Sequence, residues 1–497
     1  MPNRRITVDA SSDLGRFKSL RGVNAGPLPW TDQPGADHYD PFIEVSDRTG
    51  YRSIAADASE GYRSANIDLI RIHDNYGPGD IYANFQGSHE MADGTILSDS
   101  PRNALTMFPD LAADSSDAAN YNFGPTDELV QSIYEVGAAP LFRLGASAGE
   151  SSGVPDAFVS DADFNHYADI AAHVVLHYNK GWNNGYHLGV KYWEVLNEPD
   201  GRFDAQKYYK LYAAIARAVK AADPDAMIGG PSLMFAFGGP AYEDDFLDYL
   251  RQNDVPLDFW TFHDYCIDSA DPYYYVRVAE RMRDLLDRHG FTKAEIILGE
   301  WNVLGMDLDL LTLGGRAAFT ASSLIYMQDS PIDAQTFYMG PNLFGKDGRT
   351  PNKVGQAMVA LGRMKETPIR LAVGGSDLDG LAVQAGRSPD STTINVVISN
   401  YEVPASLRGA RPAGDVIPDY NLHLLPRRDF DYRDNGAFDL EISGLRTGVS
   451  YRAERYRIND TWDLRLLNTT TVEGTTFQVG GPLRAPGIEL VVLKQTD

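Results

Sequence analysis

Two glutamates, Glu198 and Glu300, each close a short apolar run of the chain. Glu198 lies in an Asn-Glu-Pro triplet and Glu300 in a Glu-Trp-Asn triplet. If folding brings their carboxyl groups together, they could cleave a glycosidic bond, because one can protonate the leaving oxygen while the other attacks or activates water. A separation of about 5–5.5 Å would indicate retention of configuration through a covalent intermediate.

Other polar residues close further apolar runs or follow them directly. They are His73 and Asp74 after the second run, Arg143 in the third, Ser232 after the fifth, and His263 and Tyr265 after the sixth. Such side chains can hydrogen-bond sugar hydroxyls or orient a carboxylate. Aromatic residues near the same ends could stack on the apolar face of a sugar ring, and these are Trp30, Trp301, Tyr338 and Phe344.

The elements that must position these residues alternate along the chain. Eight short apolar runs lie at 21–24, 67–72, 139–144, 190–196, 226–230, 257–262, 295–298 and 335–338. Runs of this kind are typical of strands buried on both faces in a parallel sheet. Between them, apolar or small residues recur at helical spacing. The clearest of these predicted helices are 163–178, 204–222, 276–288 and 316–327.

Eight such alternations predict an α/β fold, a (β/α)8 TIM barrel. A doubly wound open sheet is the alternative, but no Gly-rich dinucleotide-binding loop follows the first run. The active site of a barrel of this kind lies at the carboxyl ends of its strands. Glu198 and Glu300 would end strands 4 and 7, which lie nearly opposite each other, so their side chains can converge.

The sequence pattern changes after residue 365. Helical periodicity gives way to alternating strand patterns, which lie at 381–384, 393–398, 438–442, 451–456 and 488–493. We therefore predict a catalytic barrel over 16–365 and a C-terminal β-sandwich domain over 366–497. The N-terminal segment alternates too, so residues 1–15 are expected to add a strand to the sandwich. The sandwich carries no chemical motif and is expected to be structural.

Composition and charge exclude several classes of protein. Of the 497 residues, 44 are basic and 69 acidic, which gives a formal net charge of −25. This charge disfavours nucleic acid or an anionic membrane as a partner. The lone Cys266 permits neither an intrachain disulfide nor a Cys-based zinc site. His173 and His177 lie four residues apart, but no Glu follows the first as in His-Glu-x-x-His, so no metal site is predicted.

The location of the protein is inferred from two features of the chain. No apolar run approaches the roughly 20 residues that span a membrane. The N-terminus carries two arginines without a following apolar segment, so it does not have the pattern of a signal peptide. We therefore expect a cytoplasmic protein, with a secreted protein whose leader has been removed as the alternative.

The triplets around the two glutamates, at these places on a barrel, resemble those of the large clan of retaining (β/α)8 glycoside hydrolases. Within it, the chain is most similar to glycoside hydrolase family 39, which holds β-xylosidases and α-L-iduronidases. The segments that carry the resemblance are 22–29, 71–74, 193–199, 262–265 and 299–302. The resemblance covers most of the chain, including the sandwich. The Leu-Gly-Glu-Trp-Asn segment departs from the family's usual Thr-Glu-Tyr-Asn and also resembles the nucleophile segment of α-L-arabinofuranosidases.

The resemblance implies a role for each site residue. Glu198 is expected to be the general acid/base, and Glu300 the nucleophile, kept ionised by Tyr265 or Arg143. Asn197 would donate to the sugar 2-hydroxyl, a contact that strengthens in the transition state. The expected substrate-binding set is Asn197, His73, Asp74, His263, Tyr265, Arg143, Trp30, Trp301 and Phe344.

We expect a retaining exo-glycosidase that releases a pentose of the β-D-xyloside type from oligosaccharides or plant polysaccharide fragments, without cofactor or metal. One alternative is an α-L-arabinofuranosidase, or an enzyme that releases an arabinofuranose disaccharide. Another is a non-catalytic glycan-binding barrel. The expected partner is a neutral oligosaccharide or glycoside, since the negative charge would repel uronic acids. Whether the chain forms a homo-oligomer is left open.

Overall fold

The computed structural model describes most of the chain. The described residues are 3–28, 57–73, 75, 77–83, 88–90, 96–98, 105–147, 154–201, 203–266, 268–303, 310–345, 347–410, 425–430, 432 and 436–496. Two of the predicted substrate-binding residues, Trp30 and Asp74, lie outside the described residues.

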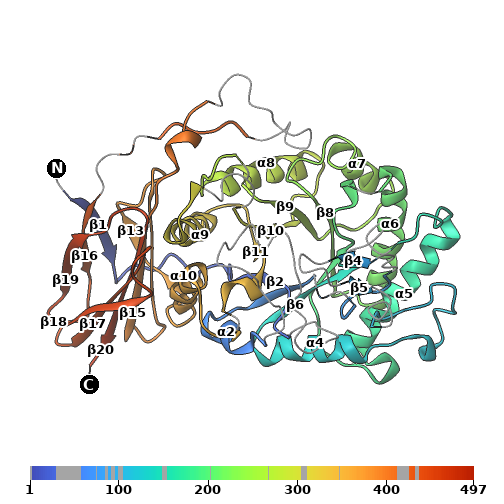
Figure 1. Ribbon diagram of the computed structural model, residues 1–497, viewed down its shortest axis with the longest axis horizontal. Helices are drawn as coiled ribbons and strands as arrows, with labels where there is room; N and C mark the ends of the chain where they lie inside the picture. The colour runs from blue at the N-terminus through green and yellow to red at the C-terminus, as the bar shows by residue number, and fades with distance from the viewer. Residues whose placement is uncertain are drawn as a thin grey trace.

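Eight parallel strands close into a barrel at the centre of the molecule (Figure 1). In order around the barrel they are β10 (Glu295–Trp301), β11 (Ala334–Phe337), β2 (Gly22–Asn24), β3 (Leu69–Ile72), β6 (Ala139–Leu144), β7 (Tyr192–Val195), β8 (Met227–Leu233) and β9 (Phe259–Asp264). Each of the eight predicted runs forms one of these strands, so the predicted barrel is confirmed. Three strands extend beyond their predicted ends, because β8 includes Ser232, β9 includes His263 and β10 includes Glu300.

Helices surround the barrel and connect its strands (Figure 1). They are α2 (Ser59–Ser64), α4 (Gly124–Glu135), α5 (Asp161–Lys180), α6 (Ala205–Ala222), α7 (Asp244–Gln252), α8 (Tyr274–Arg288), α9 (Leu313–Met327) and α10 (Lys353–Gly362). Local sequence sets their ends. Asp204 caps α6 by accepting a hydrogen bond from the backbone N–H of Lys207 at 3.0 Å, as N-cap aspartates do. Gly181, with φ 77°, ends α5, in the left-handed conformation that favours glycine.

Side chains of the barrel strands alternate between the interior of the barrel and the layer of helices. Near the amino ends, the interior is filled by a small apolar cluster, which consists of Leu69, Leu141, Phe259, Ile297 and Ala334. The outward side chains join the large core shared with the helices. Two residues further along β3 and β6, the alternation directs Arg71 and Arg143 inward. The barrel interior therefore changes from apolar to charged towards the carboxyl ends of the strands.

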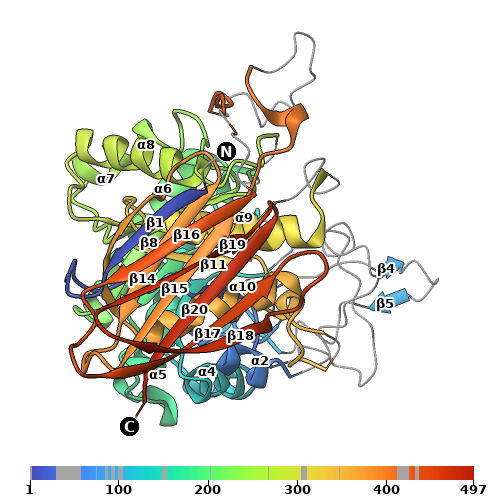
Figure 2. The ribbon, with the colours of Figure 1, turned by 90° about the vertical axis from the view of Figure 1, so that its left-hand side faces the viewer.

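Two antiparallel-rich sheets pack against each other beside the barrel (Figure 2). One consists of β13 (Ala372–Gly374), β1 (Arg4–Asp9), β16 (Ala437–Ser443) and β19 (Thr476–Pro482). The other consists of β12 (Ile369–Arg370), β14 (Leu381–Arg387), β15 (Thr393–Asn400), β20 (Gly487–Gln495), β17 (Ser450–Ile458) and β18 (Arg465–Glu473). Their facing side chains form a separate apolar core. The predicted C-terminal sandwich is confirmed.

The sandwich joins the barrel through α9, which is buried on all sides. Ser322 on α9 donates a hydrogen bond to Ser399 on β15 at 2.9 Å, and Ser399 donates to the carbonyl oxygen of Ala318 at 3.0 Å.

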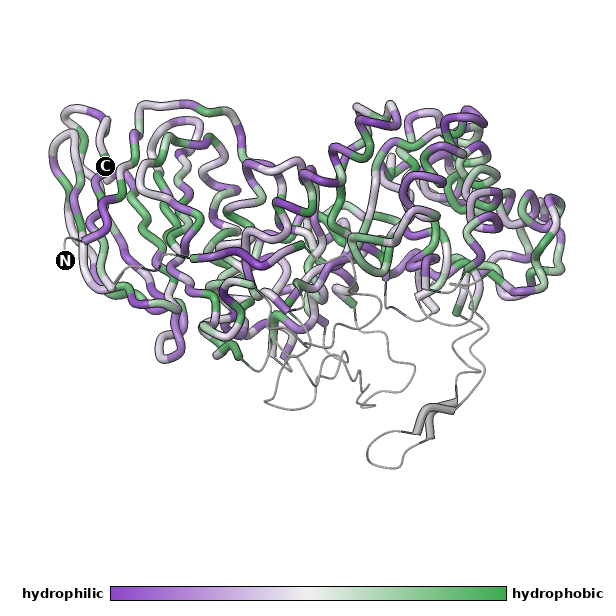
Figure 3. Tube along the Cα trace, turned by 90° about the horizontal axis from the view of Figure 1, so that it is seen from above, coloured by the Kyte–Doolittle hydropathy of each residue, from purple (hydrophilic) through white to green (hydrophobic). Residues whose placement is uncertain are grey.

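In Figure 3, hydrophobic stretches run through the strands of both parts and are interleaved with hydrophilic ones. A further two-stranded pair, β4 (Ser88–Glu90) and β5 (Ile96–Ser98), stands apart from both sheets. Within the described part of the chain, no helix is long and apolar enough to cross a bilayer.

The N-terminal strand β1 is a central strand of the sandwich. It pairs in parallel with β16 and antiparallel with β13. Ile6 and Val8 point into the sandwich core, with exposed fractions of 0% and 1%. A segment at the start of the chain thus supplies part of a core formed otherwise by its last third.

We expect Ile6→Ala to lower the free energy of unfolding by about 2–5 kcal/mol, because it leaves a cavity in the sandwich core. Urea unfolding followed by tryptophan fluorescence measures this change. Arg5→Ala is the matched control, since the neighbouring Arg5 side chain is 72% exposed and should change stability by no more than about 0.5 kcal/mol. Equal effects of the two substitutions would contradict the placement of β1.

Candidate active site

A β-bulge in β10 turns Glu300 into the barrel. Ile297 faces the interior and Leu298 the helices, so regular alternation would send Glu300 outward. The pairing of β10 with β9 shifts register between Leu298 and Glu300. A bulge of this kind re-aims the side chains that follow it. Glu300 consequently lies inside the barrel, 3% exposed.

Glu198 lies in a strained turn directly after β7. Leu196 and Glu198 both have positive φ values, 63° and 48°, in a region that costs non-glycine residues energy and is found preferentially at functional sites. Backbone hydrogen bonds hold the turn in place. The N–H of Leu196 donates to Leu144 O on β6 at 3.1 Å, and that of Glu198 donates to Ser232 O on β8 at 2.9 Å. The neighbouring strands therefore fix where the Glu198 carboxyl group begins.

His263 lies between the two glutamates. Its Nδ1 atom is 2.9 Å from Glu198 Oε1 and 3.6 Å from Glu300 Oε2. Carboxylate oxygens of Glu198 and Glu300 and a ring nitrogen of His263 all lie within 4.8 Å of one another. The structure thus brings His263 together with the two predicted catalytic glutamates. His263 itself is fully buried.

Glu300 is held by three side chains, one from β3 and two from the residues that directly follow β3 and β9. Arg71 donates from Nη1 to Glu300 Oε1 at 2.8 Å, and His73 Nε2 lies 3.2 Å from the same oxygen. The hydroxyl of Tyr265 donates to Glu300 Oε2. Tyr338 packs edge-on against the Tyr265 ring, with centroids 5.9 Å apart. Both oxygens of Glu300 are therefore directed by hydrogen-bond donors.

Arg71 is the hub of this network. It is fully buried, and it donates five hydrogen bonds to residues in the described part of the chain, as many as a guanidinium has N–H groups. Its partners are Glu194 at 2.7 Å, Asn24 at 3.1 Å, Glu300 at 2.8 Å, Asn197 at 2.8 Å and Ser232 at 3.0 Å. Two of them are carboxylates, so one buried cation stands between Glu194 and Glu300.

Burial and neighbouring charges act against each other at Glu300. Burial raises its pKa above the usual value, and the nearby Glu198 carboxyl acts in the same direction. The His263 ring, the Arg71 guanidinium and the hydrogen bond from Tyr265 act to lower the pKa. These three groups therefore favour the ionised form, which a carboxylate needs in order to attack as a nucleophile.

A third acid lies beside Glu198. Burial raises the pKa of Asp200 to about 6, and the Glu198 charge contributes. Its carboxyl oxygens accept from the backbone N–H of Met234, at 2.9 and 3.2 Å. This contact ties the turn after β7 to the segment after β8. Asp200 therefore adds to the negative character of the Glu198 side of the site.

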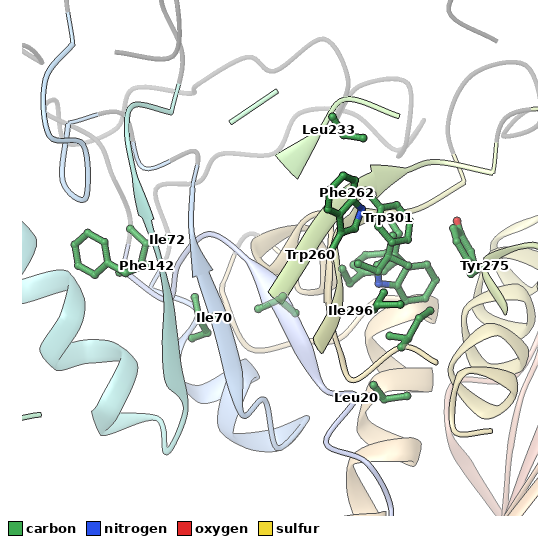
Figure 4. Close-up of a cluster of buried hydrophobic side chains, with 14 of the residues drawn as sticks. Leu20, Ile70, Ile72, Phe142, Leu233, Trp260, Phe262, Tyr275, Ile296 and Trp301 are labelled. Carbon is green, nitrogen blue, oxygen red and sulfur yellow. The ribbon is translucent and has the colours of Figure 1, made fainter. Parts of the chain in front are cut away.

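Asn197 takes its predicted place in the site, but two predicted aromatic residues do not. Asn197 Oδ1 accepts from Arg71, which orients its amide group. Trp301 is fully buried and its indole N–H donates to Gln335. Figure 4 shows it in the apolar core near Trp260 and Tyr275. The bulge that turns Glu300 inward turns Trp301 outward, so the prediction that Trp301 stacks on a sugar is wrong.

Phe344 is also a core residue. It is 1% exposed and packs against Tyr62 of α2, with ring centroids 5.9 Å apart. It follows the short helix Gly340–Leu343, which returns the chain from the barrel mouth towards α2. The structure therefore corrects its assignment as a sugar-stacking residue.

Arg143 points into the barrel but pairs with a different acid from the one predicted. It donates to Asp80 Oδ1 at 2.5 Å, and that oxygen also accepts from the backbone N–H of Ser147 at 2.8 Å. Among the described residues, no hydrogen bond joins Arg143 to Glu300. The role expected of Arg143, holding the nucleophile, belongs to Arg71 together with Tyr265.

Two residues of the site, Arg71 and Glu194, had no assigned role in the sequence analysis, and Ser232 was named there only as a polar residue after the fifth run. Arg71 and Glu194 share one detectable feature, a charge inside an otherwise apolar strand at an inward position. Ser232 has a weaker sequence signal, because the direction of its side chain depends on a register shift in β8. A charged residue within a buried strand requires a partner, and this rule could have found the Arg71–Glu194 pair.

The same cluster is where a metal ion could be held. Glu198, His263 and Glu300 are a group of three potential ligands whose donor atoms lie close together. Each of these side chains has a hydrogen-bonding partner within the site, and Glu300 is already opposed by the Arg71 cation. A cation at this position would compete with Arg71, so the donor set fits acid–base chemistry better than metal binding.

The fold and the site together define a class. A (β/α)8 barrel carries two carboxyl groups at the mouth formed by the carboxyl ends of its strands. One is held by an arginine and a tyrosine, and the other contacts a histidine. Paired carboxyl groups are what hydrolysis of a glycosidic bond requires, and the arrangement agrees with the resemblance of the sequence motifs to (β/α)8 glycoside hydrolases.

Comparison with known proteins shows which enzymes the chain resembles. Residues 105–287 match the model of Glycosyl hydrolases family 39. A β-xylosidase of Geobacillus stearothermophilus is 29% identical over 195 residues, 35% of this chain and 38% of that protein. A β-xylosidase of Caldicellulosiruptor saccharolyticus is 23% identical over 337 residues, 58% and 65% of the two chains. The matched segments thus span less than two thirds of each β-xylosidase.

A solved structure matches over the whole chain. The crystal structure of a glucosidase from Croceicoccus marinus has a TM-score of 0.82 and 29% identity, covering 100% of both chains. The family model and these relatives confirm the resemblance to glycoside hydrolase family 39 that the sequence motifs indicate.

We expect Arg71→Met to lower the free energy of unfolding by about 3–5 kcal/mol, because it leaves two buried carboxylates without a cation. Adding Glu194→Gln should restore part of this loss, since the second substitution removes one of the two charges. Urea unfolding of the single and double variants measures both effects. Lys191→Met is the control, because Lys191 is 51% exposed. A double variant less stable than Arg71→Met would contradict this account of the network.

Proposed function

We propose that the protein is a retaining exo-glycosidase that releases a pentose-type sugar, in the manner of a β-D-xylosidase, from oligosaccharides or plant polysaccharide fragments. The observation that carries this proposal is the short distance between the two carboxyl groups, since an oxygen of each lies within 4.8 Å of the other. Inverting enzymes separate these groups by about 6.5–9.5 Å to admit a water molecule. The shorter distance supports double displacement.

In the first step, a Glu300 oxygen attacks the anomeric carbon and the bond to the leaving oxygen breaks. Glu198 gives its proton to that oxygen, and the sugar is left covalently bound to Glu300. In the second step, water attacks the anomeric carbon, Glu198 takes its proton, and the bond to Glu300 breaks. The hydrogen bonds from Arg71 and Tyr265 hold Glu300 in place for both steps.

Other residues of the site are suited to binding the sugar. Asn197 directs its oxygen to Arg71, an orientation in which a sugar 2-hydroxyl would meet the N–H side of the amide. His73 borders Glu300 at 3.2 Å, where it could bind a neighbouring hydroxyl. The partly exposed Tyr338, packed on Tyr265, offers a ring near the nucleophile. A neutral sugar suits a chain with a net charge of −25.

The identity of the sugar rests on the relatives. Both curated relatives are β-xylosidases, which supports a xyloside over the arabinofuranoside alternative. The glucosidase with a TM-score of 0.82 favours a glucoside as the second candidate. The two pyranosides differ by one hydroxymethyl group, a difference that a pocket typically discriminates by roughly 10–200-fold. A purely glycan-binding barrel is not favoured, because it would not need paired carboxyl groups on a buried arginine.

The experiment that tests the proposal measures kcat/KM on nitrophenyl β-D-xyloside, β-D-glucoside and α-L-arabinofuranoside. We expect the xyloside to be preferred. A preference for the glucoside would replace it with the second candidate, and cleavage of the arabinofuranoside alone would contradict both. Proton NMR of the first-formed sugar tests retention, since an inverted anomer would exclude double displacement.

Variants of the two glutamates test their roles in the same assay. Glu300→Gln should abolish hydrolysis. Glu198→Ala should reduce kcat/KM by roughly 10²–10⁴-fold, and azide should restore turnover of activated substrates as a glycosyl azide. Glu295→Gln is the matched control, because Glu295 lies on the same strand at the amino end of the barrel, bonded to Tyr192, and should leave hydrolysis unchanged. Full activity of Glu300→Gln would contradict its role as nucleophile.

The pH dependence of hydrolysis should respond to Tyr265→Phe. The hydrogen bond from Tyr265 lowers the pKa of Glu300, so removing it raises that pKa, and Glu300 becomes protonated at a higher pH. The acidic limb of the kcat/KM profile should therefore move to higher pH. Tyr192→Phe, which removes a similar bond to Glu295, should leave the profile unchanged. A shift to lower pH would contradict the assignment.

A further inference from the structure

Ser232 lies at a distorted position of β8, inside the barrel. Met227 faces the interior and Ile228 the helices, so regular alternation would direct Ser232 outward. The pairing of β8 with β9 shifts register between Pro231 and Leu233, and Ser232 has a φ of 56°. This left-handed backbone is unfavourable for serine. It turns the side chain into the site, where it is fully buried.

The Ser232 hydroxyl has two polar partners. Arg71 Nη2 donates to its oxygen at 3.0 Å. His263 Nε2 lies 3.0 Å from the same oxygen. Arginine has no acceptor, so the direction of the first hydrogen bond is fixed. The direction of the second depends on which ring nitrogen of His263 carries the proton.

The hydroxyl proton decides between the two tautomers. A buried donor needs an acceptor, and Arg71 cannot supply one. The acceptor that the structure places at hydrogen-bond distance from the Ser232 hydroxyl is His263 Nε2. If Nε2 carried a proton instead, that proton and the hydroxyl proton would compete for the same contact. When the serine hydroxyl donates to Nε2, both the hydroxyl proton and the Arg71 N–H group have an acceptor. A neutral His263 then carries its proton on Nδ1.

The other side of the ring agrees with this assignment. Nδ1 faces Glu198 Oε1 at 2.9 Å and Glu300 Oε2 at 3.6 Å. An N–H at this position points at two acceptor groups, whereas a lone pair would face the oxygens of two carboxyl groups. The contacts of both ring nitrogens therefore favour the same tautomer.

We propose that Ser232 is a positioning residue that fixes the tautomer of His263 and thereby sets the pH range over which Glu198 releases its proton. The part concerning Glu198 rests on the proposed function, whereas the tautomer of His263 does not. Arg71 contributes indirectly, because its N–H group occupies the serine oxygen and directs the hydroxyl proton to the histidine. The serine thus links the network around the nucleophile to the acid/base.

The tautomer affects Glu198 in a definite direction. With the proton on Nδ1, His263 donates to Glu198 and favours its carboxylate form. Without the serine, the ring can carry its proton on Nε2 and accept from protonated Glu198 through Nδ1, which would hold the acid's proton to higher pH. The described charged groups that face His263 are Glu198 and Glu300 at contact distance, Asp200 beyond Glu198, and Arg71 behind Ser232. They remain in place when the hydroxyl is removed.

The variants that test this are Ser232→Ala and Ser232→Gly. Both remove the hydroxyl, and glycine also accommodates the positive φ without strain, so an effect shared by both cannot come from backbone strain. Ser322→Ala is the matched control, because it removes another fully buried serine hydroxyl with one hydrogen bond, to Ser399 at the junction with the sandwich. This control should leave both measurements unchanged.

The first measurement is the 15N NMR spectrum of the histidine rings at neutral pH. The chain has ten histidines, and the resonances of His263 are identified by their absence from the spectrum of H263Q. The wild-type protein should show a protonated Nδ1 and an unprotonated Nε2 at His263. In both Ser232 variants the proton should appear on Nε2. A wild-type ring protonated on Nε2 would overturn the proposal, whatever the activity.

The second measurement is the pH profile of kcat/KM. In both Ser232 variants kcat/KM should fall by roughly 10- to 100-fold, as is usual when the partner that orients a functional histidine is removed. Its alkaline limb should move to higher pH. A changed tautomer with an unmoved alkaline limb, or an unchanged tautomer, would overturn the proposal. A wild-type protein without glycosidase activity would refute the proposed function, and the NMR result would still decide the tautomer.

Discussion

The arrangement of the barrel mouth depends on one buried cation. Arg71 reaches its five partners from β3 across the interior, and those partners come from β2, β7, the turn after β7, β8 and β10. A guanidinium taken out of water must have its charge and its donors satisfied. Those requirements bind five segments of the chain to one geometry. Glu300 and Asn197 therefore lie where they can accept hydrogen bonds from Arg71.

Distortions of the backbone direct side chains into the barrel that regular strands would direct towards the helices. Glu300 and Ser232 both reach the interior only because their strands shift register just before them. Glu198 and Ser232 both adopt positive φ values, and a backbone hydrogen bond joins these two residues. Strain of this kind persists only where the surroundings over-determine it. Here the surroundings are the neighbouring strands and the Arg71 network, so the rigidity of the barrel maintains the geometry of the site.

The sequence was sufficient to predict the barrel, the sandwich and the pair of glutamates. Periodicity and strand ends depend on local composition, and all eight runs fall on strands. It was not sufficient to distinguish Arg71 from Arg143, since both follow an inward leucine by two residues in similar apolar strands. Which arginine meets Glu300 depends on distances across the barrel. Trp301 was misassigned because a bulge reverses the alternation of side chains. The strands β18 and β19 were missed because each buries a single residue, which leaves no alternating apolar pattern.

The two glutamates are not independent groups. Burial and the charge of Glu198 oppose the ionisation of Glu300, and Arg71, His263 and Tyr265 favour it. His263 contacts both carboxyl groups, and its far nitrogen contacts Ser232, which in turn is bonded to Arg71. A proton gained or lost at one carboxyl group therefore changes the electrostatic environment of the other, through their proximity and through the hydrogen bonds that link them by way of Arg71, Ser232 and His263. Because coupled groups titrate as a unit, the ionisation of Glu300 depends on the protonation state of Glu198.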